Sequence, residues 1–580
     1  MNTDYEYNKQ IKISIIFFIL FILTIILIST LFGIEKSDKK KPNINSKKIS
    51  YAIRGSILTS DNYFLSISKP LYKATIQKKY LDPNKQDTFI ELFSKYSGVS
   101  KATIKERLLQ SSNYVELSRD IDATTAKFLQ ELKYDLTRLK IFRPLKPNGI
   151  TIGLDIHQYK EDRLYPLKTT LSPYLGFTRE DKYGKPYGGY GLEKYYEHLL
   201  KNSSNMISTG QRDKNGIIIK DKKNKTIKKE DGFDIVTNIN LSLQKRLESI
   251  LQTQHKRIKS KEIIASVMES STGKIIAVSS TRVYNPQKFT NINDTPISAI
   301  RYIYEPGSVM KPIFFAMLLE AKKVRLSERI NTHNGRYLLR PGKIVKDEHR
   351  YPFLSASDVI VHSSNIGMIE LSKRANSLNI IDHLHKFGFA RHSGIDLAYE
   401  LSGTIPNMKE VDHTVNRAVL FYGYGIRANF FQLLKSYNVF NNNGKIITPR
   451  IASFKITKNG KKEPIAAIKP LRLLSKTNAK IMNQLLQSVV IRGTGKATKT
   501  DGLIIGGKTG TSEFSRKGIK GYNSSFFGFA NDKESKYTIG VTVIEPNPVG
   551  YIHFASQSAV PTFKNIVDAL IEEGLLKPSN

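Results

Sequence analysis

The sequence predicts an α+β fold in which an antiparallel sheet is covered by helices. Apolar runs with strand character occur in pairs, at residues 263–268 and 274–279 and again at 525–530 and 537–544, with a short turn inside each pair. Segments with apolar residues at helical spacing fill the interval between the two pairs. Strands at both ends with helices in the middle are typical of a sheet that carries helices on its faces.

The other elements follow along the chain. Residues 103–109 and 123–139 return Leu, Ile and Phe at spacings of three and four, which predicts two amphipathic helices. Residues 233–239 alternate like a strand, and residues 241–251 predict a helix behind Asn240, a suitable N-cap. The further helices that we expect are 312–322, 366–374, 431–440, 479–489 and 563–570.

Length and composition narrow the class of protein. A chain of 580 residues predicts two or three domains. The absence of Cys excludes disulfides, thiolate metal sites and cysteine nucleophiles. The formal charge of +39 fits nucleic acid, an anionic membrane or wall surface, or a Lys-rich composition. Because the basic residues are spread along the chain without a nucleic-acid-binding motif, we expect no nucleic acid partner.

The N-terminus predicts a membrane anchor. Residues 13–34 carry no charge, and a run of this length crosses a bilayer as a helix. A cleavable signal peptide is the alternative, but its apolar region would be shorter and followed by a small-residue cleavage site. The run is long and β-branched and lacks such a site. We therefore expect a tail at 1–12, an uncleaved transmembrane helix at 13–34 and a Lys-rich linker at 35–50.

Three short motifs occur in order in the second half of the chain. Each is common by itself in a chain rich in Ser, Lys and Asn, and S-x-x-K also begins at Ser37, Ser66 and Ser271. Lys-Thr-Gly, however, occurs once, and each motif lies in the local structure that its chemistry requires. The motifs are Ser308-Val309-Met310-Lys311, Ser363-Ser364-Asn365 and Lys508-Thr509-Gly510.

The first motif combines a nucleophile with a base. A chain break at residues 305–307 places Ser308 in the first turn of a helix, where free N–H groups and the helix dipole favour developing negative charge. Lys311 lies three residues further on the same face. A Lys whose pKa is lowered by burial can take the serine proton. The alternative is that Ser308 is an N-cap and Lys311 a solvated side chain.

The second motif precedes a predicted helix. Ser363 can relay a proton between Lys311 and a leaving amine, and Asn365 can hold Lys311 and a substrate amide. The alternative is that this Ser/Asn pair only caps the helix. We interpret the neighbouring His362 as structural.

The third motif follows an apolar run that predicts a strand edge with small residues, along which a peptide substrate can pair. Lys508 provides charge for a terminal carboxylate, Thr509 and Thr511 provide hydroxyls, and Gly510 allows close approach. The backbone N–H groups of Thr511 and Ser308 can form an oxyanion hole. A phosphate-binding loop is excluded, because it requires a following helix that the turn-rich sequence does not predict.

In this order the motifs resemble those of the serine acyltransferases that react with penicillin, and the chain resembles the class B penicillin-binding proteins over nearly its full length. The chain departs from the family in residues 56–62, which lack the usual Asp-Arg-Asn-Gly ending, and in an unusually basic loop at 212–229. Further segments that carry the resemblance are Arg54-Gly55-Ser56-Ile57, Arg163-x-Tyr165-Pro166, Gly188-Gly189-Tyr190-Gly191-Leu192-Glu193, Asp231-Gly232, Leu241-x-x-Gln244, Thr272-Gly273-Lys274-Ile275-Ile276-Ala277 and Gly423-Tyr424-Gly425-Ile426.

The resemblance implies an elongated N-terminal pedestal domain at 51–230 and a serine β-lactamase-like transpeptidase domain at 231–580. It implies a peptidoglycan D,D-transpeptidase in which Ser308 attacks the penultimate D-Ala carbonyl of a stem peptide, and in which β-lactam antibiotics acylate the same serine. No metal and no organic cofactor is implied. The implied catalytic residues are Ser308, Lys311, Ser363, Asn365 and Lys508, and the implied substrate-binding residues are Thr509, Gly510 and Thr511.

Within the family, Asn365 in place of Asp and the segment 524–530 resemble the cell-division type. This implies work with a membrane-embedded glycan polymerase and other division proteins, with helix 13–34 as a contact. It also implies a single-pass protein of the cytoplasmic (inner) membrane with its N-terminus inside and its catalytic domain outside. The positive-inside rule conflicts with that orientation, because Lys9 and Lys12 precede the helix and Lys36, Lys39, Lys40, Lys41, Lys47 and Lys48 follow it.

Related activities remain as alternatives. An elongation-type transpeptidase shares the fold, and a D,D-carboxypeptidase hydrolyses where a transpeptidase cross-links. A serine β-lactamase is usually shorter and unanchored, and a penicillin sensor carries additional spans and a signalling domain. A bifunctional enzyme requires a glycosyltransferase domain, which residues 54–230 do not provide.

Overall fold

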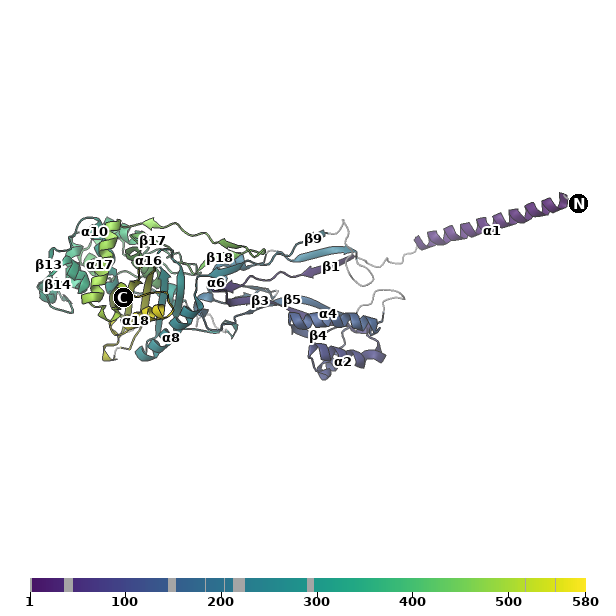
Figure 1. The fold of residues 1–580 in the computed structure, drawn as a ribbon, viewed down its shortest axis with the longest axis horizontal. Helices are drawn as coiled ribbons and strands as arrows, with labels where there is room; N and C mark the ends of the chain where they lie inside the picture. Colours follow the sequence, from purple (N-terminus) through teal and green to yellow (C-terminus); the bar gives the residue numbers. More distant parts are fainter. Residues whose placement is uncertain are drawn as a thin grey trace. The chain divides into compact units, whose positions relative to one another are not determined.

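The computed structural model describes residues 3–35, 45–143, 153–182, 184–202, 204–211, 225–288, 297–516, 518–547 and 549–579. The chain divides into two compact units, and Figure 1 shows its helices and strands. One unit holds Met1–Ile49, Pro144–Ile152 and Ile207–Ile227, and the other holds Ser50–Arg143, Gly153–Met206 and Lys228–Asn580. Most of the basic loop expected at 212–229 lies outside the described residues.

The first unit contains the N-terminal helix. Helix α1 spans Thr3–Glu35, and its segment Ile11–Gly33 has a mean hydropathy of 3.1 and is long enough to cross a membrane. The apolar run expected at 13–34 therefore lies within a helix. Residues 45–50, the end of the expected linker, form strand β1. A small sheet has the order β1-β8-β9, from Asn45–Ser50, Met206–Gln211 and Lys225–Ile227.

The second unit begins with a sheet that joins N-terminal and C-terminal segments. Its order is β19-β18-β10-β2-β3-β4, with β5 paired to β3, and β18 and β19 come from far along the chain. The strands are β2 (Ile57–Leu58), β3 (Phe64–Gln77), β4 (Tyr114–Ile121), β5 (Leu154–Leu164), β10 (Asp234–Thr237), β18 (Ala452–Ile456) and β19 (Lys462–Pro464).

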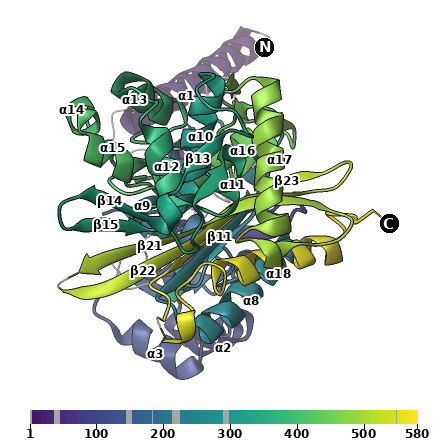
Figure 2. The same cartoon turned by 90° about the vertical axis from the view of Figure 1, so that its left-hand side faces the viewer.

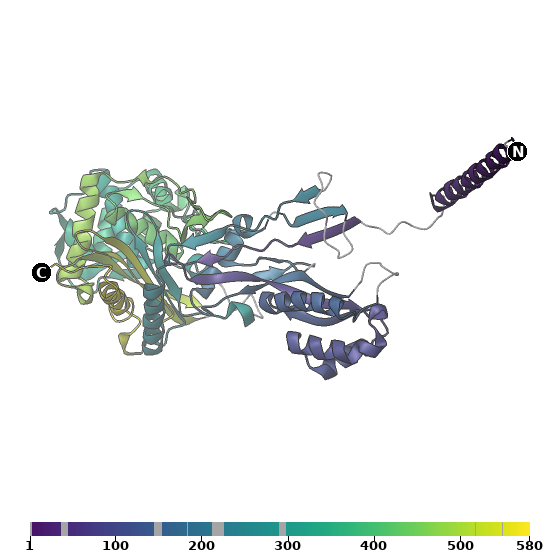
Figure 3. The same cartoon turned by 45° about the vertical axis from the view of Figure 1, so that its right-hand side comes forward.

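Three helices pack on strands β3 to β5 and enclose a core of their own (Figures 1 and 3). The predicted helices 103–109 and 123–139 correspond to α3 and α4 and are confirmed. The side chain of Asp122 caps α4 by accepting from the N–H groups of Thr124 and Thr125. The three helices are α2 (Gln86–Ser97), α3 (Lys101–Leu109) and α4 (Ala123–Arg138).

A buried ion network ties this region together. Glu193 is fully buried and accepts hydrogen bonds from Arg54 Nε at 2.9 Å and from Arg163 Nε at 2.8 Å. Arg54 also contacts Glu197 at 2.6 Å, and Arg163 donates to Ser66 Oγ at 2.8 Å. Burial opposes ionisation of Glu193, but the two guanidiniums outweigh it and hold the pKa of this carboxyl below its usual value. The network joins three separate segments that carry the family resemblance.

The larger part of the second unit is built on a five-stranded antiparallel sheet in the order β12-β11-β23-β22-β21. The two strand pairs predicted from the apolar runs are confirmed as β11–β12 and β22–β23. Strand β21 lies at one edge and contains the Lys-Thr-Gly motif. The strands are β11 (Glu262–Glu269), β12 (Ile275–Ser280), β21 (Ile504–Arg516), β22 (Ile519–Asn531) and β23 (Lys536–Ile544).

Helices cover both faces of this sheet, as the α+β prediction requires (Figure 2). Neighbouring side chains of β22 point into the two cores: Phe526 packs edge-on against Phe563 of α18, whereas Phe527 packs on Phe430 and Tyr437 of α16. The predicted cap of α8 is confirmed, because the Asn240 side chain accepts from Leu243 N. Helices α8 (Leu241–Ile258) and α18 (Ala559–Glu572) cover one face, and α10 (Lys311–Glu320), α16 (Phe430–Asn441) and α17 (Lys476–Arg492) cover the other.

Smaller elements surround the motif segments. The predicted helix at 366–374 is α12, one residue longer at its start and two shorter at its end. The hairpin β14–β15 was not predicted. These helices are α9 (Ser298–Arg301), α11 (Ala356–Val361), α12 (Asn365–Ser372), α13 (Ser377–Lys386), α14 (Met408–Asp412) and α15 (Thr414–Phe421), and these strands are β13 (Arg329–Asn331), β14 (Arg336–Arg340), β15 (Lys343–Lys346), β16 (Phe353–Ser355), β17 (Lys445–Ile446) and β20 (Leu471–Arg472).

Candidate active site

Ser308 lies in a short 3₁₀ turn, Gly307–Met310, that leads directly into α10. Its side chain is half-buried. Neither the turn nor the helix has a side-chain cap, and no described residue is hydrogen-bonded to the Ser308 hydroxyl. The alternative that Ser308 serves as an N-cap is therefore wrong. The hydroxyl stands at the start of a helix without a structural hydrogen bond.

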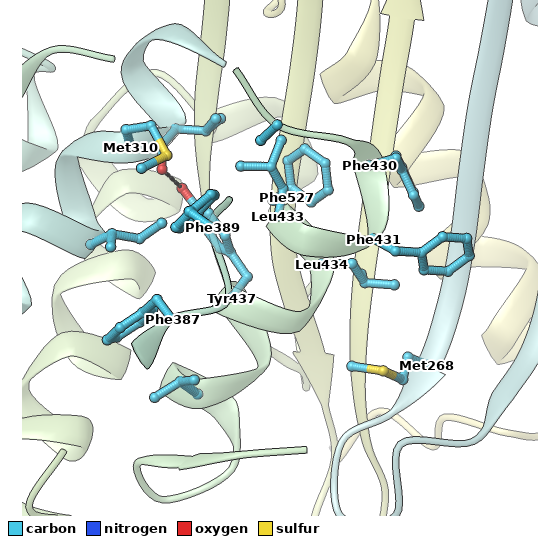
Figure 4. Packing of buried hydrophobic residues seen from close by; sticks show 14 of the residues in the cluster. Met268, Met310, Phe387, Phe389, Phe430, Phe431, Leu433, Leu434, Tyr437 and Phe527 are labelled. Carbon is cyan, nitrogen blue, oxygen red and sulfur yellow. Dashed lines mark hydrogen bonds between the residues drawn. The ribbon is translucent and has the colours of Figure 1, made fainter. Parts of the chain in front are cut away.

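The turn that carries Ser308 is fixed from behind. Val309 and Met310 are fully buried, and the Tyr437 hydroxyl of α16 donates to Val309 O at 2.7 Å (Figure 4). Gly423 has a φ of +95°, and a Cβ built on it would lie 1.8 Å from Gly307 O. Only glycine fits there. The core thus holds the backbone on both sides of the serine.

Lys311 is fully buried in the same helix. Its Nζ donates to Ser363 O at 2.5 Å, to Asn365 Oδ1 at 2.8 Å and to Ser363 Oγ at 3.2 Å. Burial lowers the pKa of Lys311 to about 7, although Asp347 and Glu348 oppose this. The alternative of a solvated lysine is therefore wrong. An amine with this pKa can serve as a base near neutral pH.

The Ser363-Ser364-Asn365 motif divides its residues between two tasks. Ser364 caps α12, because its Oγ accepts from Gly367 N at 2.8 Å. Ser363 and Asn365 flank the cap and face Lys311. Ser363 has a φ of +56°, the left-handed region that a non-glycine residue adopts at a cost of about 1–3 kcal/mol. The helix-capping alternative thus applies to the middle serine only.

Asp347 holds this motif in place and was missed by the sequence analysis. Its Oδ1 accepts from Asn365 N at 2.6 Å and from Ile366 N at 3.1 Å, and its Oδ2 accepts from Ser364 Oγ at 2.5 Å. A carboxylate at a helix N-terminus satisfies free N–H groups and complements the dipole. Asp347 directly follows strand β15, and nothing in the local sequence links it to a motif 16 residues later.

Lys508 reaches the same serine from the sheet. It is fully buried, and its Nζ donates to Ser363 Oγ at 2.8 Å and to Thr509 O at 3.1 Å. Burial lowers the pKa of Lys508 well below its usual value, and the nearby Lys311 lowers it further. The Ser363 hydroxyl therefore accepts hydrogen bonds from two lysines. Lys508 therefore faces the Ser363 hydroxyl, a contact that the sequence analysis did not predict.

The rest of the Lys-Thr-Gly strand lies against the serine turn. A Cβ on Gly510 would lie 2.8 Å from Val309 Cγ1 and 2.9 Å from Pro306 O, so only glycine allows this approach. Thr511 lies beside Gly307 and its Oγ1 accepts from Ala555 N at 3.1 Å. β21 continues as a strand to Arg516, so the phosphate-loop alternative is excluded by the structure as well.

Three neighbours of Lys508 make close contacts within the protein. Thr509 Oγ1 lies 2.6 Å from the hydroxyl of Thr494, a residue that the sequence analysis did not identify. A Cβ on Gly506 would lie 2.4 Å from the Phe529 ring, and one on Gly507 would lie 2.5 Å from the Phe526 ring. The core of the sheet therefore requires these two glycines.

His362 takes no part in this cluster. Its ring packs 5.2 Å from that of Tyr351, and burial lowers its pKa. The structural interpretation of His362 agrees with these contacts.

Two family models match the chain. The penicillin binding protein transpeptidase domain matches residues 263–568, and the penicillin-binding protein dimerisation domain matches residues 49–237. The probable peptidoglycan D,D-transpeptidase PenA of Neisseria meningitidis is 27% identical over 89% of this chain and 84% of its own length. Peptidoglycan D,D-transpeptidase FtsI of Buchnera aphidicola is 26% identical over 99% and 96%, and stage V sporulation protein D of Bacillus subtilis is 28% identical over 72% and 65%.

Solved structures share the fold. Penicillin binding protein 2X of Streptococcus thermophilus matches with a TM-score of 0.73 at 20% identity, over 91% of this chain and 82% of that one. A peptidoglycan synthetase of Bifidobacterium adolescentis matches with a TM-score of 0.73 at 18% identity, over 92% and 98%. Fold and motifs together define a penicillin-reactive serine transpeptidase. The chain belongs to the class B penicillin-binding proteins, in which a dimerisation domain precedes the transpeptidase domain.

Proposed function

We propose that this protein is a peptidoglycan D,D-transpeptidase that cross-links stem peptides through an acyl-enzyme on Ser308. The observation that carries the proposal is the position of the Ser363 hydroxyl, which two buried lysines, Lys311 and Lys508, both contact. Because this cluster lies beside a serine without a structural hydrogen bond, it combines a nucleophile, a base and a proton relay. The names of the relatives PenA and FtsI agree with this activity.

Acylation begins with neutral Lys311, which takes the proton from the Ser308 hydroxyl. The serine oxygen then attacks the carbonyl carbon of the penultimate D-Ala, and the carbonyl electrons move onto its oxygen. In this proposal the N–H groups of Ser308 and Thr511 bind the oxyanion. When the C–N bond breaks, the proton passes through Ser363 to the departing D-Ala amine, and an ester on Ser308 remains.

Deacylation uses the same groups in reverse. The amine of a neighbouring stem peptide attacks the ester carbonyl and gives its proton to the cluster of Lys311 and Ser363. The C–O bond to Ser308 breaks, the serine oxygen takes a proton back, and a new amide links the two peptides. Each group returns to its initial state, so the cycle requires no metal and no cofactor.

The donor peptide is placed along β21. This strand lies at the edge of the sheet, and its outer edge can pair with an extended peptide. Thr509, Gly510 and Thr511 are the residues that line this edge beside Ser308. Their backbone groups fix the peptide next to the nucleophile.

Labelling with a fluorescent penicillin tests this function. The wild-type protein is expected to give a single adduct by intact-mass analysis, and Ser308→Ala is expected to give none. An adduct that persists on Ser308→Ala with its circular dichroism unchanged would assign the nucleophile to another residue.

We propose further that the enzyme works in septal wall synthesis. Asn365 and the segment 524–530 resemble the division type, and one relative is named FtsI. α1 is then a single-pass anchor in the cytoplasmic membrane and a contact for a membrane-embedded glycan polymerase. Depletion is expected to give cells that grow without septation. Swollen cells that still divide would favour an elongation-type enzyme.

The orientation of the anchor is tested separately. We expect the N-terminus inside and the catalytic domain outside, although Lys residues flank both ends of the apolar run. A reporter that is active only outside the cytoplasm, fused after Ile34, should be active. Activity from a cytoplasmic reporter alone would reverse the orientation.

A further inference from the structure

The hairpin β14–β15 has one buried and one exposed face. Tyr337, Leu339 and Val345 pack on Ile366 of α12 and its neighbours. The remaining residues of the two strands are exposed, and we call them the basic hairpin face. This face consists of Arg336, Leu338, Arg340, Lys343, Ile344 and Lys346, all of them exposed.

The charges on the basic hairpin face reduce the stability of the hairpin. In the strand register Arg336 is opposite Lys346 and Arg340 is opposite Lys343, and like charges in such positions destabilise a sheet. None of these four cations forms an ion pair with a carboxylate in the part of the chain that the structure describes. Between them Leu338 is 63% exposed, opposite the exposed Ile344. A surface on which unpaired cations flank two aliphatic side chains favours a ligand of matching chemistry. Such a ligand carries negative charges with apolar groups between them.

The basic hairpin face is continuous with the catalytic centre. Lys346, its last residue, accepts a hydrogen bond at its backbone oxygen from Asn365 Nδ2 at 3.3 Å. The other side of the Asn365 amide accepts from Lys311. Asp347, the next residue, holds the N-terminus of α12. Two hydrogen bonds, through the Asn365 side chain, therefore connect the backbone of Lys346 to Lys311. A ligand on the basic hairpin face lies next to this connection.

We propose that the basic hairpin face binds the acyl acceptor, an extended peptide of a neighbouring wall strand that carries free carboxylates and an amine. This inference rests on the proposed function. The carboxylates of the acceptor pair with the four cations, and its aliphatic groups lie on Leu338 and Ile344. The donor occupies the edge of β21, so the two substrates approach Ser308 from different elements. Proximity to Asn365 and Lys311 favours a substrate over an acidic segment of a partner protein.

The test changes the two cations at the turn end, which contact no catalytic residue. The full-length Arg340→Ser, Lys343→Ser double variant is assayed in detergent with a peptide thioester donor. The acceptors are the peptide Ala-Glu-Lys, which has two carboxylates, and its diamide. The matched control is Lys476→Ser, Lys480→Ser, which removes from α17 two exposed lysines that form no ion pair with a described residue.

The acceptor KM for the free acid is expected to rise roughly three- to tenfold in the hairpin variant, because two exposed ion pairs are lost. The diamide should be used equally well by wild type and variant, and the control variant should behave as wild type. Penicillin acylation of Ser308 should remain within twofold, and removal of opposed like charges should not lower the melting temperature.

The outcomes separate the inference from the function on which it rests. Absence of a penicillin adduct on the wild type would refute the proposed function. A normal adduct together with an unchanged KM for the free acid would refute the hairpin inference. If purified acceptors were used normally but cross-linking in cells fell, an acidic protein partner would occupy the face, and the acceptor inference would be overturned.

Discussion

Two regions of the molecule bury cations in different ways. In the N-terminal domain Arg54 and Arg163 are buried against the carboxylate of Glu193. In the transpeptidase domain Lys311 and Lys508 are equally buried, but they meet at a neutral hydroxyl and a carbonyl. Burial raises the cost of charge in both places. In the N-terminal domain the opposite charges of the arginines and Glu193 offset this cost, and Glu193 stays ionised. In the transpeptidase domain no opposite charge offsets the cost fully, so the protonated amine is disfavoured and the pKa of Lys311 falls to about 7.

The difference separates stability from chemistry. A compensated network fixes one arrangement of three chain segments, and removal of one member leaves an unpaired buried charge. A pair of buried lysines without a directly bonded carboxylate does the opposite, because it keeps an amine neutral and available. Substitutions in the two regions are therefore expected to affect different measurements.

The largest expected effect is on catalysis. Lys311→Met removes the base, and the rate of penicillin acylation at Ser308 should fall roughly 10²- to 10⁴-fold, or more where nucleophile and base act as one unit. The free energy of unfolding should change little, because an apolar side chain of similar length replaces a buried amine. Stopped-flow acylation and chemical denaturation measure the two quantities.

Lys322→Met, in the exposed turn that follows α10, is the matched control and should leave both quantities unchanged. Near-normal acylation in Lys311→Met would transfer the base role to another group, such as Lys508, which also contacts Ser363.

The reverse pattern is expected in the N-terminal domain. Glu193→Gln leaves Arg163 buried without its counter-charge, and the free energy of unfolding should fall by about 3–5 kcal/mol. Penicillin acylation at low temperature should be retained, because Ser308 lies in a different domain. Glu131→Gln, an exposed carboxylate on α4, is the control. Equal melting temperatures for the two variants would contradict a stabilising role of the network.

The pH dependence of acylation sharpens the contrast. Because burial disfavours the protonated amine, Lys311 loses its proton at about pH 7, and the neutral form is the base. The rate should be constant at higher pH and fall about tenfold per unit at lower pH. The inflection belongs to the coupled pair of Lys311 and Lys508. A rate that stays flat from pH 5 to pH 9 would contradict this assignment.

The smallest expected effect concerns Asp347. Asp347→Asn keeps an acceptor for the N–H groups of α12 but removes a charge that raises the pKa of Lys311. The inflection of the acylation profile should therefore move to lower pH. Weaker positioning of Ser363 should lower the plateau rate up to roughly tenfold, the equivalent of losing about 1 kcal/mol at a helix cap. An inflection at higher pH would show that Asp347 does not act on Lys311.

The sequence predicted those parts whose signal is local. The helices at 241–251 and 431–440 and the pairs of strands follow from periodicity, and all of them exist, although α8 continues to Ile258. The three motifs were recognised by their order. Asp347, Thr494 and the partners of Glu193 could not be predicted, because they act on residues that are distant along the chain and are brought close only by the fold.

Packing also explains residues whose cause the sequence does not show. Gly506 and Gly507 are small because aromatic rings of β22 occupy the space beside them. The hairpin β14–β15 was missed, because its exposed residues are cations and aliphatics in a pattern that also fits a loop. A sequence records which residues are small or charged, and the packing determines why.

The backbone of Ser363 has a consequence for how this protein can change. Its left-handed conformation would be relaxed in Gly and tolerated in Asn, and neither residue would keep a hydroxyl between the two lysines. A screen that rewards heat resistance without activity should therefore enrich substitutions at this position. Variants selected for growth should retain the serine and its strain. The residue at position 363 would thus show whether a population was selected for heat resistance or for activity.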